Sequence, residues 1–194
     1  ENLGTGTYSM RYDMTDKIVL STNKHVIIDD KTNYTEQSVY DRATQTTTTT
    51  LKGTYQGQEI YSKYKDKYVT EKVGEDDHQI LERTYESQTD GNSIITFNAD
   101  GSISVENLGT GTYSMRYDMT DKILLSSNKH VIIDADTTYT EISEYDRATG
   151  KTTTTIDGRY NGHDIYSKYT DSYETDIATG HKILVREYGS EEGK

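Results

Sequence analysis

Residues Lys151–Asp176 read KTTTTIDGRYNGHDIYSKYTDSYETD. The Asn161-Gly162 pair at the centre is the strongest short hairpin signal, because a type I′ turn needs positive φ at both of its central residues. Threonine, isoleucine and tyrosine on either side of the pair favour a pleated strand. We therefore predict a β-hairpin in which Tyr160 pairs directly with His163.

Other turn signals divide the second half of the chain into strands. The segments 146–150 and 176–180 share a D-x-A-T-G pattern, which suits a type I turn followed by a left-handed glycine. A helix over 164–175 is the competing interpretation, but hairpin turns lie at both of its ends. The nine strands expected between the turns are 93–98, 102–105, 110–119, 122–126, 130–133, 139–145, 151–160, 163–176 and 182–188.

A long internal repeat is the most specific feature of the sequence. Glu1–Ile18 recurs letter for letter as Glu106–Ile123, an offset of 105 residues. This period is that of an independent domain, because solenoid units are only about 20–50 residues long. Glu1 lies inside a repeat, so we expect the chain to be a piece of a longer repetitive protein.

The composition indicates a folded, acidic protein. Only 31% of the 194 residues are hydrophobic, but there are 18 tyrosines and no proline, whereas disordered chains are poor in aromatic residues and rich in proline. A net charge of −12 argues against nucleic acid and anionic membranes as partners. No apolar run approaches the ~18 residues of a membrane span, so we expect no membrane insertion. The absence of cysteine excludes disulfides and thiolate chemistry.

These features predict an all-β protein made of two tandem antiparallel meander modules, residues 1–90 and 91–194. Short connections favour a meander, and a long meander hides its edges by closing into a small barrel or a sandwich. The alternatives to closure are a single twisted sheet or copies that pair edge to edge. The alternating face Tyr113, Met115, Tyr117 and Met119 is expected to be core.

The segment Gly91–Val105 has no counterpart ahead of Glu1. Its isoleucines and the only phenylalanine of the chain, Phe97, predict an integral hairpin rather than a flexible tether. We expect this hairpin to belong with residues 106–194, which leaves the first copy incomplete and with an unpaired edge.

No catalytic motif is present, and we predict no enzymatic activity and no cofactor. Nothing resembles a metalloprotease helix, a nucleophile elbow or a phosphate-binding loop. Of the five histidines, only His25 and His130 correspond at the 105-residue offset. The threonine runs 46–50 and 152–155 are interpreted as strand formers.

Acidic residues at strand ends are weak candidates for structural calcium binding. Calcium takes six to eight oxygen ligands, often from loop carboxylates. No complete calcium-binding loop occurs, and solvated acidic turns are the alternative interpretation. The candidate ligands are Asp29, Asp30, Asp134, Asp136 and Asp100.

Residues 95–126 resemble the opening of bacterial lipocalin-like domains of secreted or surface lipoproteins. The resemblance lies in a "tFn.dGt" hairpin and a following "GtYs" strand, and the tryptophan usual near the start of such domains is absent. It implies a small antiparallel barrel at the cell surface and no particular site residues. The matching residues are Phe97, Asn98, Asp100, Gly101, Gly111, Tyr113 and Leu124.

Tandem near-identity, acidity and the lack of motifs predict a non-enzymatic structural or adhesive repeat of a bacterial surface, fibre or matrix protein. Its expected partners are neighbouring copies or other chains at strand edges, and glycans stay open. The alternative is a lipocalin-like barrel for a small apolar ligand. That barrel needs a cavity lined by Tyr113, Met115, Tyr117, Ile165, Tyr169 and Tyr173.

Overall fold

The computed structural model describes residues 3–189 and shows an all-β protein. The described residues contain no helix, and so none that is long and apolar enough to cross a membrane. The strands of the first half are β1 (Thr7–Asp13), β2 (Ile18–Asp29), β3 (Thr32–Asp41), β4 (Thr46–Tyr55), β5 (Gln58–Val73), β6 (Asp76–Tyr85) and β7 (Asn92–Phe97). Those of the second half are β8 (Ile103–Gly109), β9 (Thr112–Asp118), β10 (Ile123–Ile132), β11 (Thr138–Asp146), β12 (Lys151–Tyr160), β13 (His163–Thr175) and β14 (Lys182–Tyr188).

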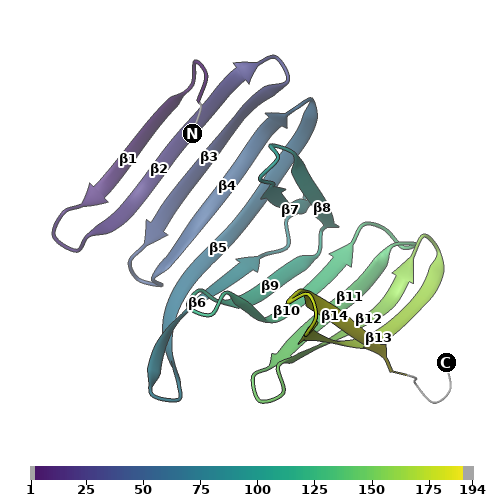
Figure 1. The fold of residues 1–194 in the computed structure, drawn as a ribbon. Helices are drawn as coiled ribbons and strands as arrows, with labels where there is room; N and C mark the ends of the chain where they lie inside the picture. Colours follow the sequence, from purple (N-terminus) through teal and green to yellow (C-terminus); the bar gives the residue numbers. More distant parts are fainter. Residues whose placement is uncertain (1–2, 190–194) are drawn as a thin grey trace.

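One antiparallel meander runs through both copies of the repeat. The strands follow the order β1 to β6 and then β9 to β14, and β6 pairs directly with β9. β1 and β14 are the two ends of this path, and they lie far apart (Figure 1). The expected closure into a barrel or a sandwich is therefore wrong, because β6 continues the sheet into β9 and the end strands β1 and β14 do not pair with each other.

The predicted turns and strands of the second copy are largely confirmed. Asn161 and Gly162 both have positive φ, and Tyr160 pairs with His163 as expected. The segment 164–175 is strand and not helix. One division is wrong: residues 122–126 and 130–133 were expected as two strands, but β10 runs unbroken because Ser127, Asn128 and Lys129 pair with β9 on one side and β11 on the other.

The tyrosine–methionine face does not form an enclosed core. Tyr113, Met115 and Tyr117 are half-buried and Met119 is exposed. In β1, which has the same seven residues as β9, the equivalent side chains are exposed. The sheet is open, so this face has a cover only where other chain segments cross it.

The hairpin of β7 and β8 leaves the meander and lies across one face of it, in front of β5 in Figure 1. It is an integral hairpin, as predicted. Its side chains Ile95, Ile103 and Val105, however, pack against the core cluster of the first copy. That cluster consists of Val26, Tyr34, Leu51 and Ile60. The hairpin also contacts the second copy, because Ile94 and Leu108 pack with Val131 and Gly109 pairs with Ile132 of β10, so its place with residues 106–194 stays a prediction.

The face of the second copy has no equivalent cover among the described residues. Tyr139, Ile156 and Ile165 correspond to three buried residues of the first cluster but are only half-buried. A smaller cluster lies where the copies meet and contains Tyr85, Leu108 and Val131. The two expected modules, 1–90 and 91–194, thus share one sheet; residues 1, 2 and 190–194 of these ranges lie outside the described residues.

Candidate functional site at the junction of the two copies

The two copies join where β6 pairs with β9, and we call this pairing the junction. The paired residues run from Ile80 opposite Asp118 to Tyr85 opposite Tyr113. Ile80 and Tyr85 are buried as completely as residues of a domain core. The junction is therefore a packed interior position of the sheet.

An aromatic stack with an arginine supports one face of the junction. The Tyr85 ring lies between those of Tyr64 and Tyr113, with centroid distances of 5.2 and 5.6 Å. The guanidinium of Arg83 lies 4.0 Å from the Tyr64 centroid and donates two hydrogen bonds to Asp66, at 2.6 and 2.7 Å. Burial raises the pKa of Tyr85 to about 12, so its hydroxyl keeps its proton near neutral pH.

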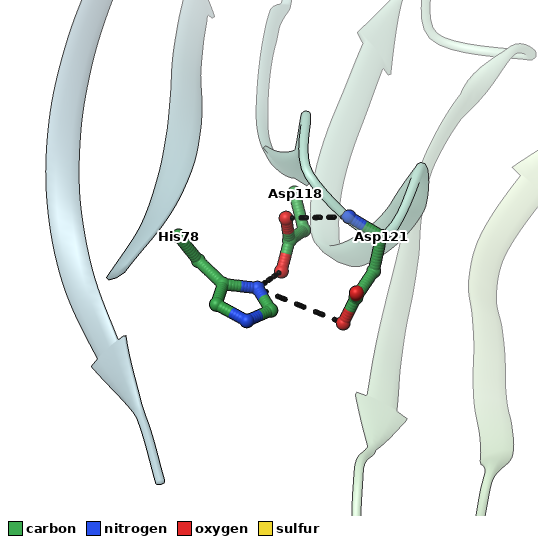
Figure 2. Close-up of side chains that lie close together, drawn as sticks. All are labelled: His78, Asp118 and Asp121. Atoms are coloured by element: carbon green, nitrogen blue, oxygen red, sulfur yellow. Dashed lines mark hydrogen bonds and ion pairs between the residues drawn. The ribbon is translucent and has the colours of Figure 1, made fainter. Parts of the chain in front are cut away.

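An ionic cluster lies at the other end of the junction and consists of His78, Asp118, Asp121 and Arg147 (Figure 2 shows the first three). Nδ1 of His78 lies 2.7 Å from Oδ2 of Asp118 and 3.6 Å from Oδ2 of Asp121. Arg147 donates to both carboxylates, at 2.9 Å for Asp121. The cluster therefore links β6 of the first copy to β9 and the β11–β12 turn of the second.

The hydrogen bonds of Asp118 fill its carboxylate. Oδ1 accepts the backbone N–H groups of Thr120 and Asp121 at 2.8 and 3.0 Å, and Oδ2 accepts from His78 and Arg147. Burial alone would raise the pKa of Asp118, but these hydrogen bonds outweigh it and hold that pKa well below its usual range. The side chain is fully buried, so the negative charge depends on these donors.

The chemistry of the cluster favours an ionic lock over a metal centre. His78, Asp118 and Asp121 lie close enough to one another to hold a metal ion. A carboxylate with two oxygens offers about four lone pairs, and those of Asp118 are all engaged. A divalent cation would have to displace the Arg147 guanidinium, which is already the counter-charge.

A histidine–aspartate pair is also two thirds of a catalytic triad. A triad needs a nucleophile next to the second ring nitrogen of the histidine. Among residues 3–189, no serine or threonine hydroxyl is hydrogen-bonded to His78, whose recorded partners are the two aspartates. The cluster can therefore fix the copies relative to each other, but it contains no nucleophile for the histidine to activate.

Sequence reasoning missed the role of His78 although a signal was present. The second copy is two residues shorter ahead of its last strand, so His78-Gln-Ile-Leu aligns with His181-Lys-Ile-Leu at an offset of 103. His78 and His181 are thus a second repeated pair, beside His25 and His130. Asp118 and Asp121 recur in the same way as Asp13 and Asp16, and Arg147 as Arg42.

The calcium candidates lie apart from this cluster and bind amides of their own turns. Asp29 accepts from the backbone of Lys31 and Thr32, and Asp134 from Asp136 and Thr137. Asp100 accepts from Ser102. Asp30 and Asp136 are exposed. No three of the five candidates come together into a group that could hold a metal ion in the part of the chain that the structure describes.

The six residues expected to line a lipocalin-like cavity do not share one of the grooves found among the described residues: Ile165 lines one groove and Met115 another. A groove of about 710 Å³ does exist where β4 and β5 meet the β7–β8 hairpin. Its lining includes Lys52, Glu59, Asp90 and Asn107, and none of the six expected residues contributes to it. Of those six, Tyr173 is exposed to solvent.

Comparisons of the chain with protein-family models, with curated proteins and with solved structures found no match. The function of the chain is therefore inferred from the repeat and from the geometry of the junction.

Proposed function

We propose that this chain is a non-enzymatic structural or adhesive repeat, a spacer within a long extracellular protein of a bacterial surface, fibre or matrix. The observation that carries the proposal is the junction, in which β6 of one copy pairs with β9 of the next. A protein that repeats this pairing grows as one continuous sheet. Its length then increases with the number of copies, which is the property that a spacer needs.

Two further features support a spacer. Both copies retain the Arg–Asp–Tyr arrangement that supports the sheet: Arg186 donates to Asp171 at 2.7 and 2.8 Å and lies 3.9 Å from the Tyr169 centroid. The net charge of −12 keeps such a chain soluble and opposes non-specific clustering.

The proposal requires the two copies to be held rigidly, and spin labels can test this. The chain has no cysteine, so Asn23→Cys and Asn128→Cys place labels at the same exposed position of each copy. We expect one narrow distribution of label-to-label distances by pulsed electron resonance. A double variant within the first copy, Asn23→Cys with Thr84→Cys, is the control. It gives the width of the distance distribution for two labels that are held rigidly within one copy.

The junction itself supplies the second control. Ile80→Asp places a charge at a fully buried position. The distribution of distances between labels at 23 and 128 should therefore broaden, while that between labels at 23 and 84 should change less. A broad distribution in the unmodified junction, as for two modules on a flexible tether, would contradict the spacer.

A further inference from the structure

We propose that separate copies of this chain join end to end, with β14 of one chain paired antiparallel to β1 of the next. The inference rests on the same junction as the proposed function, but it concerns association between chains. β1 pairs only with β2 and β14 only with β13, so each has one free edge in the described part of the chain. Free strand edges are templates for pairing with another chain.

The two free edges have the sequences of the two strands that meet at the junction. β1 and β9 are both TYSMRYD. β14 reads KILVREY and corresponds to Gln79–Tyr85 of β6, which reads QILERTY. The two segments have isoleucine, leucine, arginine and tyrosine at the same positions. The junction register therefore predicts the pairs between chains: Ile183 with Asp13, Leu184 with Tyr12, Val185 with Arg11, Arg186 with Met10, Glu187 with Ser9, and Tyr188 with Tyr8.

Burial shows what each edge lacks. Ile80, Leu81 and Tyr85 of β6 are 0%, 7% and 2% exposed. Their equivalents in β14, namely Ile183, Leu184 and Tyr188, are 44%, 48% and 70% exposed. In β1, Tyr8, Met10 and Tyr12 are 53%, 52% and 41% exposed. Pairing of the two edges would cover both sets of apolar side chains.

Charged groups at the two ends are complementary halves of the ionic cluster. At the β1 end, Arg42 donates to Asp13 and Asp16, as Arg147 does to Asp118 and Asp121 at the junction. The missing member there is a histidine equivalent to His78. His181 supplies that residue at the β14 end. In the proposed contact, His181 of one chain donates to Asp13 of the next.

The chain ahead of β1 already has the conformation found at the junction. The N–H of Gly6 donates to the carbonyl of Leu3 at 2.9 Å, and that of Gly111 donates to Leu108 at 3.0 Å. Gly4 pairs with Ile27 in parallel, as Gly109 pairs with Ile132. Leu108 packs against Tyr85 at the junction. Leu3 is thus placed to contact Tyr188 of a neighbouring chain without rearrangement.

The contact uses a different surface on each partner, and such head-to-tail interfaces produce open chains unless a rotation closes them. One feature of the junction is lost, because Val185 replaces Glu82, which pairs with Arg116 at 3.4 Å. The covalent link between the strands is also absent, so association should depend on concentration.

Sedimentation velocity of the full chain tests the proposal. We expect a series of oligomers that lengthens as concentration rises. Tyr12→Asp blocks the β1 edge and Leu184→Asp blocks the β14 edge, and each should weaken association about tenfold or more because the contact buries the new charge. Val39→Asp, at an exposed position of β3 away from both ends, is the matched control and should associate like the unmodified chain.

A mixture of the two blocked variants is the sharper test. Each keeps one intact edge, so together they should form a one-to-one dimer and nothing longer at concentrations where each variant alone is monomeric. Self-association of either variant as strong as that of the unmodified chain would overturn the head-to-tail geometry. So would an unmodified chain that stays monomeric up to ~1 mM, the range of the weakest specific binding.

Disulfide trapping checks the register independently of the blocking variants. A chain with Ser9→Cys and Glu187→Cys has thiols at positions that face each other only between chains, so mild oxidation should produce a ladder of linked oligomers. Ser9→Cys with Thr175→Cys moves the second thiol to the far end of β13 and should give none. Ladders of equal strength from the two cysteine pairs would reject the register. The spin-label distances within one chain test the proposed function independently of this result.

Discussion

At the scale of single residues, equivalent side chains of the two copies have similar neighbours in sequence but different burial. Ile60 and Ile165 both follow the two-residue turn into the next strand, yet only Ile60 is buried. The difference arises because Ile95, Ile103 and Val105 of the hairpin pack against the cluster that contains Ile60. Contacts of this kind are made by residues far apart in the sequence, and the local pattern does not contain them.

This pair predicts unequal costs for the same substitution. Ile60→Ala should lower the free energy of unfolding by about 3 kcal/mol, the usual cost for a buried isoleucine, and Ile165→Ala by about half as much. Urea denaturation of the two variants measures both values against the unmodified chain. Equal costs would mean that the hairpin does not cover the first copy in solution.

The buried carboxylate of Asp118 predicts a pH dependence. Its pKa is lower in the folded protein than the ~3.9 of an unfolded aspartate. Its contribution to stability is therefore complete above about pH 4 and is lost as the pH falls through the folded pKa. Asp118→Asn should cost about 1.5–3 kcal/mol at pH 7, because it removes the charge that Arg147 and His78 bind.

The same variant should lose less stability than the unmodified chain when the pH falls below about 4, since one titrating group has gone. Chemical denaturation at a series of pH values measures this slope. Asp13→Asn is the matched control: Asp13 binds Arg42 but is partly exposed, so the variant should show a smaller loss at pH 7. A loss as large for Asp13→Asn would remove the special role of burial at the junction.

At the scale of elements, strands and turns could be predicted because their signals are local. Asn161-Gly162 fixes a turn, and the turn fixes the register of β12 and β13. What the sequence could not supply is the partner of each outer strand. β6 and β9 are separated by the β7–β8 hairpin, and only their pairing decides between a closed module and a continuous sheet. The ionic cluster depends on that pairing too, so His78 could not be placed beside Asp118.

Turns also explain the acidic residues that made calcium a candidate. Asp29, Asp100 and Asp134 accept hydrogen bonds from amides of their own turns, which is a sufficient structural reason for an aspartate there. We expect the melting temperature in millimolar calcium to equal that in a sodium salt of the same ionic strength. Addition of a chelator should leave it unchanged. A rise with calcium alone would show binding to the folded state and would restore these turns as sites.

At the scale of the whole molecule, the two copies of the repeat share one continuous sheet. Copies of about 105 residues suggest independent modules. Each module would have its own hydrophobic core, and few contacts would join one module to the next. In the structure the most completely buried apolar residues, Ile80 and Leu108, lie in β6 and β8, where the copies meet, whereas the exposed apolar residues of β1 and β14 mark the ends. Stability should therefore be highest in the middle of the chain.

Amide hydrogen exchange in the monomeric chain distinguishes the two arrangements. A continuous sheet frays from its ends, because β1 and β14 have one paired neighbour each, whereas β6 and β9 have neighbours on both sides and β6 contributes the buried Ile80, Leu81 and Tyr85. We expect the slowest amides in β5, β6, β9 and β10, and the fastest strand amides in β1 and β14. Independent modules would instead show two maxima of protection, one near β3–β4 and one near β11–β12, with a minimum at β6 and β9. Measurement in Ile80→Asp provides the reference, since a charge at the centre should convert the single maximum into two.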